Sequence, residues 1–76
     1  MAGWRPLKRR EFIRRLRVLG FGGPFSGTRH QFMVLGMQRQ TIPTKAEYPV
    51  PQVRMLLRQV ESILGRSITL DEGESL

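Results

Sequence analysis

The chain has 76 residues and carries 13 Lys and Arg against 6 Asp and Glu, a formal net charge of +7. A domain of this size buries only about 60% of the surface that its unfolded chain exposes, which favours a binding surface over a deep metabolite cavity. The absence of cysteine excludes disulfides and thiolate metal sites. With one histidine and few acids, we expect neither a bound metal nor a cofactor.

The positive charge lies in the body of the chain. Residues 1–60 hold twelve Lys or Arg against two Glu, whereas residues 61–76 hold one Arg against four acids. This imbalance predicts a polyanionic partner for the first sixty residues. No stretch approaches the roughly 18 apolar residues of a membrane span, and the start has no apolar signal segment. We expect a soluble cytoplasmic protein that does not enter a membrane.

The first predicted element is an amphipathic helix over residues 7–20. Its apolar residues recur at helical spacing: Phe12, Ile13, Leu16 and Leu19. Gly20 is a natural helix end. Arg10, Arg14 and Arg17 fall opposite the apolar stripe. These arginines form either a solvated helix face or a stripe that binds RNA phosphates, and the shortage of acids on this helix favours RNA.

Three short extended segments are predicted next. Residues 21–25 suit an edge strand or an irregular extended segment better than a central strand, because glycines and a proline interrupt them. Residues 26–28 suit a turn, and 29–35 form the best strand pattern of the chain. Gly36 then opens a tight connection to a strand over 39–43, so a hairpin is expected. Residues 44–50 are interpreted as a linker.

The clearest helical pattern covers residues 51–64, with Pro51 in the first turn and Gly65 at the end. Thr69 and Glu72 have the spacing of a capping box and predict a short acidic helix. Residues 1–6 and 74–76 are expected to fray. The whole chain, 1–76, is interpreted as a single domain.

This order predicts an α+β fold of the α-β-β-β-α type. Two helices cover one face of a small three-stranded antiparallel sheet and leave the other face to solvent. Double-stranded-RNA-binding domains and several small nucleases share this arrangement.

The turn Gly27-Thr28-Arg29-His30 holds the only histidine. Cleavage of RNA without a metal needs a base for the 2′-hydroxyl proton and cations for the phosphorane charge. Histidine is the residue type that exchanges a proton near neutral pH. Gly27 allows close backbone approach, Thr28 adds a hydroxyl group, and Arg29 adds a cation. His30 is therefore a candidate general base.

A structural interpretation of His30 stays open at this point. A lone histidine at the start of a strand is more often a surface or half-packed residue than a catalytic one. Strand alternation places His30 on the same face as Phe32 and Val34. If the helices cover that face, His30 must lie at the rim of the sheet to act on RNA.

The chain resembles the HicA (YcfA-like) family of small bacterial toxins. The similarity runs over most of the chain in short motifs: the end of a basic first helix at Leu19-Gly20-Phe21, the turn over 27–30, Ile42-Pro43, and the start of the last long helix at Pro51. The turn fits the family's Gly-Ser/Thr-x-His pattern. The order and spacing of the motifs carry the resemblance.

The resemblance implies an mRNA interferase of a type II toxin-antitoxin system. It implies a double-stranded-RNA-binding-like fold, cleavage of mRNA through His30, and inhibition by a HicB-type antitoxin. Many family members have a second histidine in a Pro-x-His pattern, whereas this chain has Pro43-Thr44-Lys45. Lys45 can bind phosphate but is a poor proton donor or acceptor at neutral pH.

The leading hypothesis from sequence is a metal-independent endoribonuclease with His30 as its catalytic base. The RNA-binding residues would be Arg10, Arg14, Arg17, Gly27, Thr28, Arg29 and Lys45. The alternative is a noncatalytic RNA-binding module with the same basic surface. A third possibility is a protein-interaction domain whose positive helix binds an acidic partner. Only chemistry separates the first two, because they share charge and fold.

Overall fold

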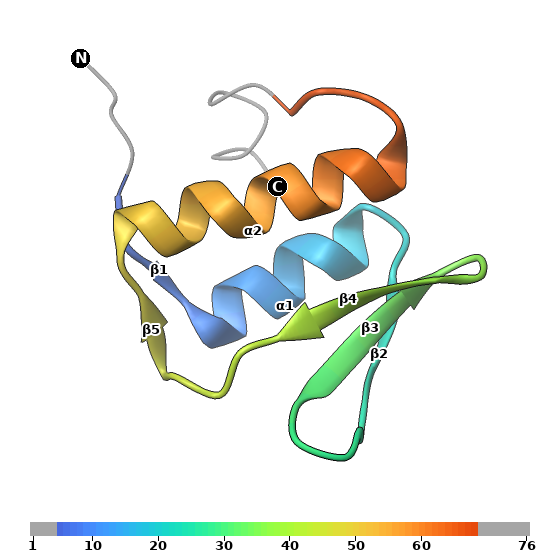
Figure 1. Cartoon of the computed structure of the whole chain (residues 1–76), viewed down its shortest axis with the longest axis horizontal. Coiled ribbons are helices and arrows are strands. Elements are labelled where there is room, and N and C mark those ends of the chain that lie inside the picture. The colour runs from blue at the N-terminus through green and yellow to red at the C-terminus, as the bar shows by residue number, and fades with distance from the viewer. Residues whose placement is uncertain (1–4, 69–76) are drawn as a thin grey trace.

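The structure is a computed structural model that describes residues 5–68 (Figure 1). Along this range the elements follow the order β1 (Leu7–Lys8), α1 (Arg9–Val18), β2 (Gly22–Phe25), β3 (Gln31–Leu35), β4 (Gln38–Ile42), β5 (Glu47–Tyr48) and α2 (Val50–Leu64). Strands β2, β3 and β4 form one antiparallel sheet, and β1 pairs with β5 in a second. The predicted α+β fold with a three-stranded sheet and two helices is confirmed.

Strands β3 and β4 form the predicted hairpin. Leu35 pairs with Gln38, so only Gly36 and Met37 lie in the connection. Gly36 has a φ of 62° and Met37 does not have a positive φ, as in a type II′ turn. This turn matches the right-handed twist of the strands, which explains why a two-residue connection suffices.

The two faces of the β3-β4 hairpin differ in burial. Met33 and Ile42 are fully buried, and Gln40 is buried beside them. On the opposite face, Phe32 is half-buried and Arg39 is exposed. The helices therefore cover the face that carries Met33, and the face that carries Phe32 is open to solvent.

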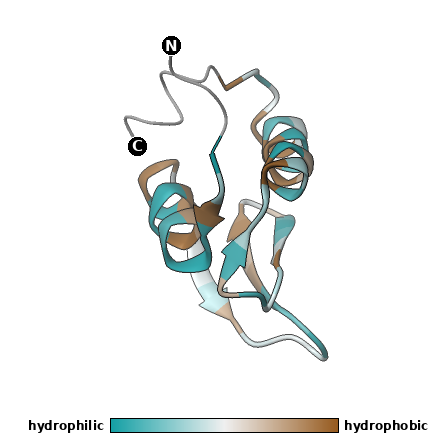
Figure 2. Cartoon of the chain, turned by 90° about the vertical axis from the view of Figure 1, so that its left-hand side faces the viewer, coloured by the Kyte–Doolittle hydropathy of each residue, from teal (hydrophilic) through white to brown (hydrophobic). Residues whose placement is uncertain are grey.

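Both helices end where the sequence predicts. Gly20 follows α1 with a φ of 105°, and the Phe21 backbone N–H donates to the Leu16 carbonyl at 2.9 Å. Gly65 ends α2 with a φ of 74°. A left-handed residue at this place lets the chain turn back and satisfies free carbonyls, and glycine adopts it without a β-carbon clash. Figure 2 shows that the helices have distinct hydrophilic and hydrophobic sides.

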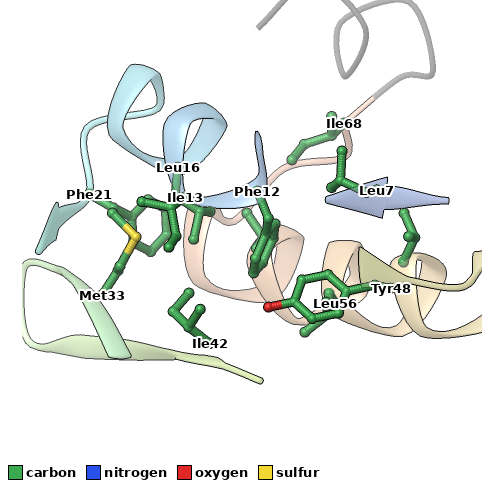
Figure 3. Packing of buried hydrophobic residues seen from close by; sticks show 12 residues of the cluster. Leu7, Phe12, Ile13, Leu16, Phe21, Met33, Ile42, Tyr48, Leu56 and Ile68 are labelled. Carbon is green, nitrogen blue, oxygen red and sulfur yellow. The ribbon is translucent and has the colours of Figure 1, made fainter. Parts of the chain in front are cut away.

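The core lies between the helices and the inner face of the sheet (Figure 3). Its buried residues are Leu7, Phe12, Ile13, Leu16, Phe21, Met33, Ile42, Tyr48, Val53, Leu56, Val60 and Ile68. Phe12 and Tyr48 meet edge to face, with ring centroids 5.8 Å apart at 87°. This geometry suits the quadrupoles of aromatic rings. The two rings join α1 to the β5 segment.

The pairing of β1 with β5 corrects two sequence-based boundaries. Leu7 pairs with Tyr48 and Lys8 with Glu47, so α1 begins at Arg9 and residues 44–50 are not wholly a linker. Strands of two residues are too short to display alternation, which is why the sequence does not reveal them. The predicted short helix at 69–72, and the ends 1–4 and 74–76, lie outside the described residues.

Candidate functional site

A surface pocket of about 290 Å³ lies beside the connection between β2 and β3. The connection forms the loop at the bottom of Figure 1, between the two strands. Among the described residues, the pocket is lined by Arg9, Ser26, Gly27, Arg29, His30, Gln31 and Thr44. Three segments that are distant in sequence thus meet here: the start of α1, the loop before β3, and the chain that follows β4.

The loop geometry requires glycine at position 27. A β-carbon there would lie within 3.0 Å of the His30 carbonyl oxygen, a separation that real β-carbons essentially never show. The same β-carbon would lie 3.4 Å from the Phe32 ring. Gly27 therefore lets the chain fold back closely on the His30 backbone. The sequence-based argument for close approach at this turn has a specific structural basis.

His30 is exposed and directly precedes β3. Strand alternation places His30 on the side of β3 that carries Phe32. This side faces solvent, so the helices do not cover His30. The structure brings together three of the predicted site residues in this pocket: His30, Arg29 and Gly27. His30 is therefore accessible from solvent beside Arg29 in this lining.

Arg9 is a pocket residue that sequence reasoning missed. Its Nε donates to the Pro43 carbonyl oxygen at 3.2 Å, and its Nη2 donates to Gln31 Oε1. The Arg9 backbone N–H also donates to the Ala46 carbonyl at 2.9 Å. A guanidinium group has five N–H donors, so these two side-chain bonds leave donors for an anion. Arg9 therefore holds Pro43 and Gln31 together beside the pocket and gives the lining a positive charge.

Pro43 links the pocket to the core. Its carbonyl oxygen accepts the bond from Arg9 and a second bond, at 2.6 Å, from the Tyr48 hydroxyl. Burial raises the pKa of Tyr48, and the nearby Arg9 charge acts in the opposite direction. At neutral pH the Tyr48 hydroxyl therefore keeps its proton and donates the hydrogen bond that holds the Pro43-Thr44 segment in place.

The lining is electropositive. Its described residues include two arginines, Arg9 and Arg29, and no carboxylate. Two cations on one small concave surface favour a phosphate group, and arginine can bind phosphate through two parallel hydrogen bonds. The same composition means that no carboxylate among the described lining residues orients the His30 ring.

The remaining predicted RNA-binding residues lie outside this lining. Lys45 is exposed directly after Thr44, and Thr28 is exposed between two lining residues. Arg10, Arg14 and Arg17 are exposed on α1. These side chains therefore take no part in the lining of the pocket.

Arg14 and Arg17, like Arg9, have partners within the described chain. Arg14 forms an ion pair with Glu11 at 3.0 Å, and Arg17 Nε donates to the Gly23 carbonyl at 3.2 Å. The hydrogen bond from Arg14 lowers the pKa of Glu11, as do the charges of the neighbouring arginines. This helix keeps a large excess of positive charge, because Glu11 is its single acid.

Comparison with protein-family models, with curated proteins and with solved structures finds no match in any of the three. In residues 5–68 no helix has the length and apolar character needed to cross a lipid bilayer. Within the same range, no three His, Cys, Asp or Glu residues gather into a candidate metal site.

Proposed function

We propose that this protein is an endoribonuclease that cleaves mRNA in the cytoplasm, as the toxin of a HicA/HicB-type toxin-antitoxin system. The observation that carries the proposal is the shared lining of one pocket by His30, Arg9 and Arg29. A base and two cations on one electropositive surface are the groups that metal-independent RNA cleavage needs.

In the proposed mechanism His30 accepts the proton of the ribose 2′-hydroxyl. The 2′-oxygen then attacks the adjacent phosphorus, and Arg9 and Arg29 stabilise the negative charge of the phosphorane. The bond to the 5′-oxygen breaks, and this oxygen takes a proton from the protonated His30 or from water. The products are a 2′,3′-cyclic phosphate and a 5′-hydroxyl. His30 performs the proton transfer without a second histidine, because Lys45 stands where many HicA-like proteins have one.

A second candidate function is noncatalytic RNA binding by the same surface. The lack of a carboxylate beside His30 among the described lining residues favours it, since catalytic histidines are commonly oriented by such a group. Salt-sensitive RNA binding that survives His30→Ala, together with no cleavage product, would support this second function.

The proposed protein partner is an acidic HicB-type antitoxin that covers His30. The exposed arginines of α1, Arg10, Arg14 and Arg17, offer the charge that carboxylates of such a partner would match. A complex in which the antitoxin leaves His30 fully open would contradict inhibition by occlusion. Binding of an acidic partner without any RNA binding would instead support a protein-interaction domain.

The experiment that tests the proposed function follows both cleavage and toxicity. Purified protein is incubated with mRNA in EDTA, and product ends are analysed for 2′,3′-cyclic phosphate. The gene is also induced in bacteria, and growth is followed. Cleavage and growth arrest that both require His30 support the proposal. Cleavage only after addition of a divalent metal would rule out the metal-independent mechanism.

A further inference from the structure

The solvent face of the sheet carries an aromatic pair beside an arginine. Phe25 on β2 and Phe32 on β3 are register partners, and their ring centroids lie 5.8 Å apart. The guanidinium carbon of Arg39, on β4, lies 4.6 Å from the centre of the Phe32 ring. Three adjacent strands thus contribute two rings, whose planes are tilted by 40°, and a cation that lies over one of them.

This surface does not belong to the core. Phe25 is 49% exposed, and Arg39 is exposed as well. A phenylalanine that leaves half its surface in water loses much of the burial energy that normally favours this residue. Neither ring is needed to fill the space between sheet and helices, because that space lies on the other face, where Met33 and Ile42 are buried.

The aromatic pair is continuous with the pocket. Phe25 directly precedes Ser26, which lines the pocket, and the Phe32 ring lies next to the position of Gly27. His30, in the loop that leads into β3, is two residues before Phe32. A nucleotide whose phosphate occupies the pocket can therefore place a neighbouring base over the rings.

We propose that Phe25, Phe32 and Arg39 form a stacking platform for an unpaired base next to the scissile phosphate, so that the substrate is single-stranded RNA. Nucleobases stack on aromatic rings and guanidinium planes when they are free of a duplex. The inference rests on the proposed function for the identity of the ligand as RNA. It adds which strand form binds and which residues select it.

Charge complementarity favours RNA over a protein on this face. Arg39 lies over one ring, and the adjacent pocket adds Arg9 and Arg29 without a lining carboxylate in the described part of the chain. Rings combined with cations suit a ligand that alternates flat bases with phosphates. An apolar protein segment would gain little from this concentration of positive charge.

A base-stacking measurement tests the platform directly. The probe is a short single-stranded RNA that carries fluorescent 2-aminopurine beside a 2′-deoxy nucleotide, which prevents cleavage there. Binding to the wild-type protein should quench the fluorescence, and the matching duplex should bind more weakly. Phe25→Ala and Arg39→Gln should each weaken binding of the single strand. The affinity of Phe25→Ala for the probe should fall about 5- to 150-fold.

Matched controls come from α2. Met55→Ala removes an apolar side chain that is 46% exposed, close to the exposure of Phe25, and Arg58→Gln removes one exposed charge. Both control variants should bind the probe nearly as the wild type does. Thermal unfolding of each variant checks that the fold persists. Phe32→Leu provides a second variant, which removes the aromatic ring but keeps an apolar side chain.

The outcomes separate this inference from the proposed function. Unchanged quenching and affinity in folded Phe25→Ala would overturn the platform even if RNA is cleaved. Equal affinity for duplex and single strand would also overturn it. If Phe25→Ala lost binding to an acidic protein partner but kept its RNA binding, the face would be assigned to protein contact instead. Stacking of the probe with no cleavage of ordinary RNA would support the platform and contradict the enzyme.

Discussion

The carbonyl oxygen of His30 lies too close to the position that a β-carbon on Gly27 would take for such an atom to fit there. The two residues are therefore coupled through the backbone: glycine at 27 permits the turn that presents His30 at the pocket. Gly27 itself adds no charge to the pocket. What it determines is the position of the His30 main chain, because any side chain at position 27 would push that main chain away.

Gly27→Ala should impair RNA cleavage, because the added methyl group displaces the His30 backbone. We expect at least about a 10-fold loss of rate, as displacements near 1 Å at a reacting group can cost about 100-fold. Gly22→Ala is the matched control, because the nearest atom to its β-carbon, the Val34 carbonyl oxygen, is 4.0 Å away. Equal rates for the two variants would show that the turn does not position His30.

Arg9→Gln should lower both stability and RNA affinity. The variant loses the bonds from the guanidinium to the Pro43 carbonyl and to Gln31, which we expect to cost about 1–2 kcal/mol of unfolding free energy. Urea unfolding and RNA titration measure the two effects. Arg58→Gln is the control, since it removes the same charge from an exposed residue of α2 that lies outside the proposed site. Similar losses in both variants would reduce Arg9 to a general surface charge.

The pH dependence of stability should report Tyr48. Burial raises the folded-state pKa of Tyr48, so its contribution is complete below the ordinary value of 10.0 and is lost as the pH rises through the higher folded value. Urea unfolding between about pH 8 and about pH 11 should show this decline. Tyr48→Phe should flatten the decline while losing about 1 kcal/mol at neutral pH with the bond to Pro43. An unchanged slope would contradict the assignment to Tyr48.

Gln40→Met should leave the protein as stable or more stable. Gln40 is 1% exposed, and within residues 5–68 its Oε1 accepts no hydrogen bond, although its Nε2 donates to Gln59 Oε1 at 2.8 Å and to the Thr41 carbonyl at 3.1 Å. An unpaired buried acceptor costs about 1–3 kcal/mol, and Gln59 is exposed to water once Gln40 is replaced. Thermal unfolding gives the comparison. A loss above about 1 kcal/mol would indicate that the Gln40 amide is fully satisfied.

The sequence predicts the helices and the hairpin because their signals are local. Apolar spacing marks both helices, and glycine ends each of them where a left-handed residue is required, at Gly20 and Gly65. The turn at Gly27 is likewise visible as a short motif. These features depend on neighbours within a few residues, which is the range that periodicity and turn chemistry describe.

The rest of the site depends on contacts between distant segments. Arg9 looks like one more basic residue of an amphipathic helix until β1 pairs with β5 and brings the start of α1 beside Pro43. The pairing of Phe25 with Phe32 follows from a register shift in β2. Neither the two-residue strands nor the register shift has a signature in the order of residues, so both emerge only from the folded chain.

The central claim is that His30 is the base of an RNA-cleaving site. The most direct test compares wild type and His30→Ala for release of 2′,3′-cyclic phosphate ends from a single-stranded RNA in EDTA, with RNA affinity measured in parallel. We predict that the variant binds RNA nearly as the wild type does and cleaves at least about 100-fold more slowly. Equal cleavage by the two proteins, or no cleavage by either, would contradict the claim.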